Sequence, residues 1–431
     1  MVVFFGYNRK FYYLCIGFEK EKEVIMIKRE LYLEKLRPFI DKPIIKVITG
    51  IRRCGKSELL KMVRQEVVER GVAEEQIVYV NFESFAWRSY ATAEALYDYL
   101  DKKRGEAEGE KLYLFVDEIQ EVKEWEKVIN SVYADWDVDV YITGSNSRLL
   151  SSELSTYLAG RYIEIRIFPL SFKEFLFFKN GDKVLGKTEI LDVFDVYLRQ
   201  GGFPVAHINS YKDAEIYQLV SDIYASVLLR DTIQRYNIRN VDMLERLVAF
   251  LFDNLGNCFS AKNIIAYLKN QQRKLDYETL YNYLQALESS FIVYKVPRYD
   301  LKGKELLQTN EKYFISDLSL IYAHRGYTPE LISGMLENLV FLELMRQGYI
   351  VYVGKGANYE VDFVGIKQDK KVYVQVSYRI DSEETRDREL KPFRLINDNY
   401  PKYLVTTDYL MAGNIDGVEC MHIADFLLRD I

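Results

Sequence analysis

The residues with the clearest capacity for chemistry lie between positions 50 and 57, where the sequence is GIRRCGKS. This segment fits the pattern G-x-x-x-x-G-K-[ST] of a phosphate-binding loop. Its glycines allow backbone dihedrals that bring N–H groups close to phosphate oxygens. Lys56 would neutralise the β- and γ-phosphates of a nucleotide, and the hydroxyl of Ser57 would be a ligand of Mg²⁺. The segment therefore predicts a site for ATP and Mg²⁺.

The predicted nucleotide-binding residues include every position of the loop except Ile51 and extend one position beyond it. Two of them, Arg52 and Arg53, carry positive charge that could serve either the phosphates or a partner. A glycine-rich turn without a ligand is disfavoured, because an apolar run precedes the loop and a helical pattern follows it. The set comprises Gly50, Arg52, Arg53, Cys54, Gly55, Lys56, Ser57 and Glu58.

A pair of adjacent acids provides the second candidate. The apolar segment LYLFVDEIQ, residues 112–120, ends in Asp117 and Glu118. A strand of this kind next to the loop would place Asp117 beside the Mg²⁺ held by Ser57. Glu118 could then act as the general base that polarises the attacking water. A solvated strand end is the alternative, but the position of the pair after a phosphate loop favours the catalytic interpretation.

Small polar residues follow a further apolar run, residues 138–143. Polar groups at the carboxyl end of a strand face the ligand crevice of an open α/β sheet. Ser145 or Asn146 could therefore sense the γ-phosphate or orient water. Ordinary turn and helix-cap chemistry is the alternative, since this composition also suits a turn.

The elements that would position these residues alternate between strands and helices, which predicts an α/β domain with a parallel sheet. We expect helices over residues 57–70, 92–100 and 149–158, a charged loop over 103–111, and strands over 44–49, 76–82, 112–117, 138–143 and 162–168.

Composition places limits on the whole chain. Its 431 residues suit two or three domains. The net charge of −6 gives no overall reason to expect a nucleic-acid binder, although a local basic patch stays open. Four cysteines without metal-ligand spacing indicate free thiols in a reducing cytoplasm. Because no apolar run approaches the roughly 20 residues of a membrane span, we expect no membrane-spanning segment.

The N-terminal segment is interpreted separately. Residues 1–18 are apolar and aromatic, but their apolar pieces are too short for a signal peptide. Met26 begins a plausible helix, and the acidic and basic run EKEKE stands just before it. We therefore expect Met26 to be the natural start and residues 1–25 to be a translated leader or a disordered extension.

Five segments in this order carry a family resemblance: GIRRCGKS, LFVDEIQ, ITGSNSRLLSSEL, LAGRYIEIRIFPLSFKEF and LRQGGFP. Over residues 26–431 the chain resembles the AAA+-related ATPases of bacteria and archaea that carry a C-terminal nuclease-like domain. The resemblance implies that Asn146 is the sensor of strand four, with Ser145 as the alternative. It also implies that Arg161 contributes to the γ-phosphate of its own or a neighbouring subunit, although a surface ion pair is an equal alternative.

The resemblance also organises the rest of the chain. Residues 26–204 would form the ATPase domain, in which the helical stretch 172–199 closes over the nucleotide. Arg199 could be a second phosphate sensor, or it could satisfy the carboxyl end of its own helix. Residues 205–328 would form a helical connector with the helix, turn, helix and hairpin order of a winged helix. Its second helix, DYETLYNYLQALES, is acidic, so a structural or protein-binding role is favoured over DNA reading.

The last part, residues 329–431, resembles the PD-(D/E)xK nuclease core. Glu337 takes the position of the helix glutamate and Asp362 that of the strand aspartate. Gln375 and Ser377 stand where that chemistry needs Glu and Lys, so the metal and the water would lack their partners. We therefore expect a degenerate domain that binds or dimerises without cleaving nucleic acid.

The predicted fold is α/β: a P-loop NTPase domain, a winged-helix-like region and a C-terminal α/β nuclease-like domain. The predicted function is Mg²⁺-dependent ATP hydrolysis coupled to a conformational change. A nucleotide-gated switch without turnover, and a DNA-processing ATPase or nuclease in which Lys371 or Arg379 substitutes for the missing lysine, are the alternatives. Homo-oligomerisation, a protein partner and DNA stay open as partners, besides ATP.

Overall fold

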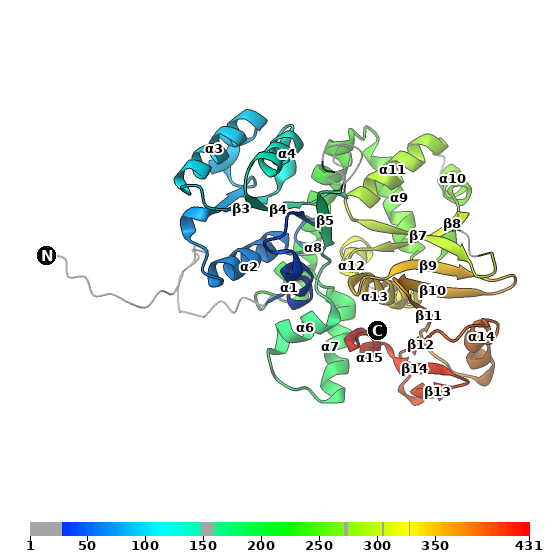
Figure 1. Ribbon diagram of the computed structural model, residues 1–431. Helices are drawn as coiled ribbons and strands as arrows, with labels where there is room; N and C mark the ends of the chain where they lie inside the picture. The colour runs from blue at the N-terminus through cyan, green and yellow to red at the C-terminus, as the bar shows by residue number, and fades with distance from the viewer. Residues whose placement is uncertain (1–27, 148–157, 159, 271–274, 304–305, 327) are drawn as a thin grey trace.

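The computed structural model describes residues 28–147, 158, 160–270, 275–303, 306–326 and 328–431 (Figure 1). The predicted leader and most of the predicted helix 149–158 lie outside these residues. Figure 1 shows a first α/β layer, a group of helices from the middle of the chain, and a second sheet with its own helices.

The first sheet has five parallel strands in the order β2-β3-β4-β1-β5. Every residue of β1, β3 and β4 is buried, as expected when helices cover both faces of a parallel sheet. This arrangement confirms the predicted α/β fold class. The strands are β1 Ile45–Thr49, β2 Ile77–Asn81, β3 Leu112–Asp117, β4 Val138–Gly144 and β5 Tyr162–Arg166.

Helices cover both faces of this sheet. One face packs against α1 (Glu30–Leu36) and α2 (Lys56–Glu69), and the other packs against α3 (Ala93–Glu106) and α4 (Trp125–Asp135). The predicted charged loop 103–111 is wrong over its first residues, because α3 continues to Glu106. Its last turn is held by the ion pairs Lys103–Glu106 and Arg104–Asp101, each three residues apart.

Helices of the middle region connect the two sheets. The stretch predicted as one helix is two, α6 Phe172–Asn180 and α7 Lys187–Gln200, because Gly181 ends α6 with a positive φ of 59°. Next come α8 Asp213–Ser226, a π-helix η7 Val227–Gln234, and α9 Val241–Asp253.

The second sheet has nine strands in the order β13-β14-β12-β11-β10-β9-β7-β8-β6. Strands from both sides of the predicted boundary at residue 328 share this sheet, because β7 pairs with β9. The connector and the C-terminal part therefore do not have separate sheets. The strands are β6 Cys258–Phe259, β7 Val293–Asp300, β8 Leu306–Ile315, β9 Ile350–Lys355, β10 Glu360–Lys367, β11 Lys370–Ser377, β12 Lys402–Thr406, β13 Gly413–Ile415 and β14 Val418–His422.

Two helices precede the β7–β8 hairpin, in the order predicted for the connector. The helices of this half are α10 Ala261–Asn270, α11 Tyr277–Ser289, α12 Ser319–Arg325, α13 Ile332–Arg346, α14 Glu383–Arg394 and α15 Ile423–Leu428. Strand β12 lies inside the sheet, between β11 and β14. Strands β13 and β14 and helix α15 were not predicted.

One hydrophobic core joins α1 at the beginning of the described chain to α15 at its end. Arg346 of α13 is fully buried against the first half, where it donates hydrogen bonds to the carbonyls of Pro169 (3.3 Å) and Leu170 (3.5 Å). Lys35 of α1 donates in turn to the carbonyl of Arg346 (2.6 Å). The C-terminal region is thus packed against the half of the chain that contains the first sheet.

Candidate functional site

The loop between β1 and α2 has the backbone that its glycines predict. Gly50 has a φ of 150°, and a Cβ atom there would lie 2.3 Å from the carbonyl oxygen of Ile167 and 2.9 Å from Sγ of Cys54. Gly55 has a φ of 103° at the N-cap of α2. Both positions therefore require glycine, and α2 directs its amino end at the loop.

Lys56 lies inside the loop rather than in solvent. Its Nζ is 3.2 Å from the carbonyl oxygen of Gly50, 3.3 Å from that of Ile51 and 3.6 Å from Oε1 of Glu118. Burial lowers the pKa of Lys56, but Glu118 and other anionic neighbours raise it by more. The ammonium group stays charged and is positioned to meet anionic phosphate oxygens.

The acidic pair lies at the carboxyl end of β3, next to β4. The hydroxyl of Thr143 donates a hydrogen bond to Oδ1 of Asp117 (2.5 Å) and accepts one from the backbone N–H of Glu118 (2.9 Å). Thr143 therefore fixes both acids. Burial raises the pKa of Asp117, and the hydroxyls of Thr143 and Ser57 next to its carboxylate lower it by less.

Glu118 is held in an unusual conformation. Its φ of 54° is in the left-handed region, which is uncommon for residues other than glycine and is concentrated at functional sites. Gln120 donates a hydrogen bond to its carboxylate. Burial raises the pKa of Glu118, but Lys56, Gln120 and Arg52 together lower it below its usual value. Glu118 is therefore ionised at neutral pH and could accept a proton.

The residues at this edge fit a magnesium ion bound with a nucleotide. Oδ2 of Asp117 is buried without a hydrogen-bond partner among the described residues, and Ser57 lies next to the same carboxylate. A hydroxyl and a carboxylate oxygen are ligands that Mg²⁺ accepts together with phosphate oxygens. Within the described residues, no cluster of three or more His, Cys, Asp or Glu side chains could hold a metal by itself.

The turn after β4 contains Ser145 and Asn146, which are both buried. Since β4 pairs with β1, this turn lies beside the phosphate loop. The hydroxyl of Ser145 is 3.5 Å from Oδ1 of Asp231 and also lowers the pKa of Glu118. Ser145 thus links Glu118 to a residue of the middle region.

Asp231 is a site residue that the sequence did not predict. It is fully buried in the π-helix η7, and its Oδ2 accepts a hydrogen bond from Nε of Arg52 (3.1 Å). Nη1 of Arg52 contacts Oε1 of Glu83 (2.9 Å). A π-helix is rare and frequently marks a functional position. The only sequence signal is an acid within an apolar helical stretch, and 179 residues separate it from Arg52.

A second unpredicted residue, Arg29, contacts the backbone of the loop. It donates hydrogen bonds to the carbonyls of Cys54 and Phe168 (both 2.9 Å) and pairs with Glu174 (2.6 Å). Glu174 also forms a capping box with Ser171 at the start of α6. The S-x-x-E pattern could have indicated this helix start, but not its arginine partner.

Other predicted residues are exposed at the loop or lie far from it. Arg53 and Glu58 are exposed at the loop, and Glu58 pairs with Lys61 (2.7 Å). Arg161 precedes β5, and the first residue of β5 pairs with the first residue of β1. Arg161 therefore lies at the amino ends of the strands, roughly 15 Å from the loop of the same chain, which follows the carboxyl end of β1. Its Nη1 donates to Oδ1 of Asn130 (2.8 Å). The structure does not bring Arg161 to its own nucleotide site.

Arg199 is also remote from the loop. It is exposed near the end of α7 and donates to the carbonyl of Asp195 (3.3 Å). The break after α7 does approach the site, because Pro204 lies against the position of a Cβ at Gly55, 3.9 Å away. The predicted boundary segment therefore touches the loop through its proline rather than through its arginine.

The acids predicted for a nuclease-like site do come together, but a lysine stands among them. Nζ of Lys312 in β8 is 2.9 Å from Glu337, 3.1 Å from Asp362 and 3.8 Å from Glu360. Gln375 accepts from the backbone N–H of Asp362 (3.2 Å). Burial and Asp362 raise the pKa of Glu337 to about 8. This cluster is neutralised internally rather than arranged for a divalent cation.

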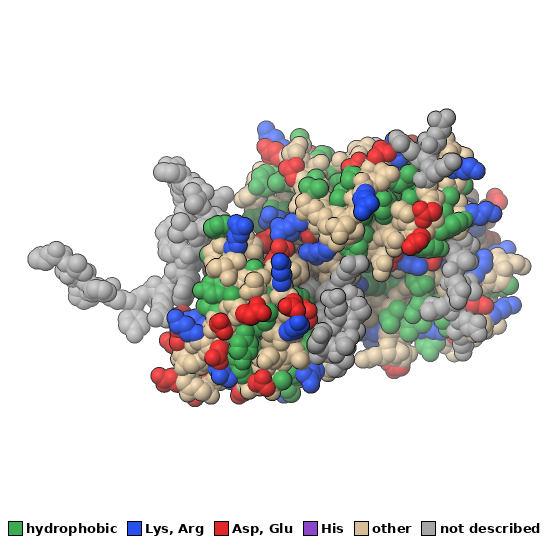
Figure 2. All heavy atoms as spheres, turned by 90° about the horizontal axis from the view of Figure 1, so that it is seen from above, with side chains coloured by type: hydrophobic (Ala, Val, Ile, Leu, Met, Phe, Trp, Pro, Cys, Tyr) green, Lys and Arg blue, Asp and Glu red, His purple; other side chains and the backbone are tan. Residues whose placement is uncertain are grey.

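The outer surface and the helices add two observations. Acidic and basic side chains are interspersed on the face shown in Figure 2. Across the described chain, each helix is too short or too polar to cross a lipid bilayer.

Two family models match parts of the chain. Residues 42–176 match the family described as an AAA domain, and residues 191–331 match a domain of unknown function (DUF8612). An uncharacterized protein of Haemophilus influenzae is 39% identical over 405 residues, which cover 94% of this chain and 99% of that protein. The chain belongs to the family of that protein. The AAA domain contains the loop, the acidic pair and the β4 turn, which supports ATP binding.

Two further proteins are similar. The uncharacterized protein MJ1544 of Methanocaldococcus jannaschii is 32% identical over 81% of this chain and 78% of its own length. Among solved structures, the Walker-type ATPase PABY2304 of Pyrococcus abyssi is 16% identical and covers 69% of this chain and 96% of its own, with a TM-score of 0.48.

Proposed function

We propose that this AAA-domain protein is a Mg²⁺-dependent ATPase that couples hydrolysis to a conformational change acting on a partner. The observation that carries the proposal is the buried contact between Lys56 and Glu118, with Asp117 and Ser57 beside it. A loop lysine, an ionised acid and a potential metal ligand thereby share one edge of the sheet. This is the set of groups that phosphoryl transfer to water requires.

Each residue has a role in this proposal. The loop amides and Lys56 hold the phosphates, Ser57 and Asp117 hold Mg²⁺, and Asn146 contacts the γ-phosphate. The metal supplies positive charge where negative charge develops on the phosphate oxygens. Glu118 accepts the proton of the attacking water. It can do so because its lowered pKa keeps the carboxylate deprotonated at neutral pH.

The partner and the assembly are part of the proposal. Arg161 would serve a neighbouring subunit in a homo-oligomer, because it lies at the opposite edge from its own loop. We place the protein in the cytoplasm with its thiols reduced; Cys54, Cys258 and Cys420 are free. The C-terminal region would keep the shape of a nuclease without its activity, since Lys312 occupies the centre of the acidic cluster.

A nucleotide-gated switch is the second candidate. It is favoured by the contacts of Glu118, which is bound to Lys56 and Gln120 and would have to exchange partners before it could act on water. In that case the conformational change would follow binding alone.

Phosphate release and nucleotide binding by the Glu118→Gln variant separate the two candidates. The ATPase predicts turnover in the wild type that falls by a factor of about 100 or more in the variant, with ATP binding retained. The switch predicts equally low release from both proteins. Glu121→Gln is a matched control, because Glu121 lies three residues away and pairs with Arg230 (3.1 Å). Duplex and single-stranded DNA are added in parallel, and stimulated release would identify DNA as the partner.

A further inference from the structure

The second sheet is split between two of its strands. β7 pairs with β8 along its length, but it pairs with β9 only at Arg298–Asp300, opposite Val353–Lys355. Upstream of this point the strands diverge around a cavity of about 1120 Å³, which residues 293–295 and 297 of β7 and 350–352 of β9 both line. The cavity is therefore a gap inside a sheet, between two strand edges.

The edge of β7 that faces this gap has backbone groups available for pairing. The carbonyl of Ile292 accepts a hydrogen bond from the N–H of Ser316 in the β8 direction (3.2 Å). In an antiparallel pair such bonds recur at every second residue, so Tyr294 also bonds toward β8. Val293 and Lys295 consequently direct their N–H and C=O groups away from β8, toward the gap.

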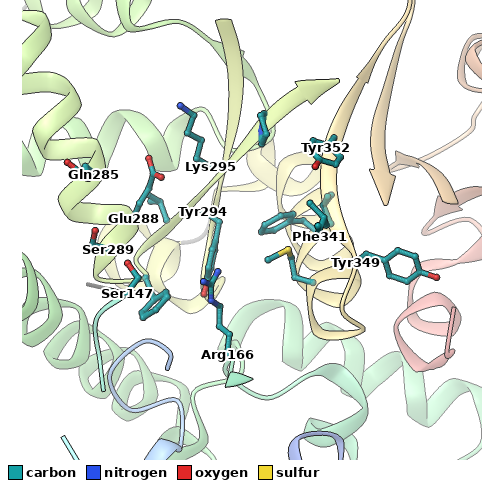
Figure 3. A pocket seen from close by; sticks show the side chains of 16 residues that line it. Ser147, Arg166, Gln285, Glu288, Ser289, Tyr294, Lys295, Phe341, Tyr349 and Tyr352 are labelled. Carbon is teal, nitrogen blue, oxygen red and sulfur yellow. The ribbon is translucent and has the colours of Figure 1, made fainter. Parts of the chain in front are cut away.

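The two sides of the gap differ in chemistry. Figure 3 shows Glu288 and Ser289 of α11 on one side of Tyr294, and Phe341 and Tyr349 on the other. The α13 side is apolar, and the ring of Phe341 on this side lies 5.8 Å from that of Tyr294. The α11 side carries the carboxylate of Glu288.

Two polar groups at this gap have no partner among the described residues. Within the described part of the chain Glu288 makes no ion pair, because Lys295 is paired with Glu311 instead (2.8 Å). The hydroxyl of Tyr294 is buried without a hydrogen bond. Buried polar groups are normally satisfied, so the hydroxyl of Tyr294 points to a ligand with a donor or an acceptor, and the half-buried carboxylate of Glu288 at the same gap offers a site for a cationic group. Burial raises the pKa of Glu288 to about 7, against the effect of Lys295, and a cationic group beside it would stabilise its charged form.

We propose that this gap binds an extended segment of a partner protein, about five residues long, in which basic and apolar side chains alternate. The segment adds a strand beside β7 and hydrogen-bonds to Val293 and Lys295. Its successive side chains point to opposite sheet faces. Basic residues then face Glu288, and apolar residues face Phe341 and Met345.

The position of the gap connects it to the nucleotide loop. The ring of Tyr294 lies 5.7 Å from that of Phe168, and Arg29 hydrogen-bonds both the carbonyl of Phe168 and that of Cys54 in the loop. A peptide bound against Tyr294 is thus connected to the phosphate loop through the contacts of Phe168 and Arg29. This link rests on the proposed function, whereas peptide binding itself does not need ATP.

Fluorescence anisotropy with the full chain tests the proposal without nucleotide. The probes are labelled eight-residue peptides that alternate Lys or Arg with Val, Leu or Phe. We expect saturable binding that weakens about tenfold in Glu288→Gln, as for loss of one charge-assisted hydrogen bond. Glu278→Gln, an exposed acid of the same helix, should bind as the wild type does. A peptide with Glu in place of its basic residues should not bind.

The backbone contacts are tested separately. N-methylation of alternate peptide amides should abolish binding, and hydrogen exchange at Val293 and Lys295 of the wild-type protein should slow when the unmodified peptide is added. Failure of every alternating peptide to bind at about 1 mM, a weak-affinity limit, overturns the proposal. So does unchanged affinity in Glu288→Gln with unchanged exchange, or displacement of the peptide by single-stranded DNA that binds more tightly. These results do not depend on whether ATP is hydrolysed.

Discussion

The contact between Arg52 and Asp231 provides the sharpest test of how the middle region is joined to the nucleotide loop. Asp231 is fully buried, and the Arg52 side chain is only 8% exposed, with 3.1 Å between Nε and Oδ2. Asp231→Asn keeps the shape of the side chain but removes its charge. The guanidinium of Arg52 then remains buried with one carboxylate instead of two.

The size of the effect follows from that second carboxylate. Removing one partner of a buried ion pair costs about 3–5 kcal/mol. Glu83 still contacts Arg52 at 2.9 Å, although it is 38% exposed and its interaction is partly screened. We therefore expect Asp231→Asn to lower the free energy of unfolding by about 3 kcal/mol, the lower end of that range.

A double-mutant cycle isolates the pair. Asp231→Asn, Arg52→Gln and the double variant are unfolded in urea and followed by tryptophan fluorescence, since all three tryptophans, at positions 87, 125 and 136, lie in the AAA domain. We expect a coupling energy of about 2 kcal/mol. The exposed pair Arg230–Glu121 provides a control cycle with an expected coupling below about 1 kcal/mol. A coupling energy near zero for Arg52 and Asp231 would refute the reasoning.

Three other predictions concern stability. Burial lowers the pKa of His207 to about 4; because the unfolded chain binds this proton more readily, stability should fall by about 2 kcal/mol from pH 7 to pH 5 in urea titrations, and His207→Gln should lack this loss. Gly202→Ala should lower the free energy of unfolding by about 2 kcal/mol in urea titrations, because its Cβ would lie 2.4 Å from the carbonyl oxygen of Leu170. Gly105→Ala in α3 is the control: its Cβ meets nothing within 4 Å, so the substitution should be neutral or stabilising in the same titrations. Lys312→Gln should lower the unfolding free energy by about 3 kcal/mol, because it leaves neighbouring buried carboxylates without their shared cation; an unchanged urea midpoint would contradict that electrostatic role.

The local parts of the site were predictable because contiguous residues determine them. The phosphate loop, the acidic end of β3 and the polar turn after β4 each combine a strand with the residues that follow it. In a parallel sheet such strand ends meet at one edge. The same rule places Arg161 away from the loop of its own chain, because a residue that precedes β5 must lie at the amino ends of the strands.

The residues that the sequence did not reveal come from distant segments. Arg29 and Cys54 are 25 residues apart, Arg52 and Asp231 are 179 apart, and Lys312 and Asp362 are 50 apart. No short pattern records such pairs, since each depends on how complete elements pack. The split between β7 and β9 is likewise a property of pairing register, whereas the strand signal of each segment was visible separately.

Binding of ATP at the loop is tested most directly by calorimetric titration of Mg²⁺-ATP into the wild type, Lys56→Ala and Lys61→Ala. Lys61 is a matched control because it belongs to the same helix, and it pairs with Glu58 at the surface. We expect saturable binding by the wild type and by Lys61→Ala, and affinity at least about tenfold weaker in Lys56→Ala, which lacks a charge-assisted contact to phosphate. Equal affinity in all three proteins, or no binding by the wild type, would contradict nucleotide binding at this loop.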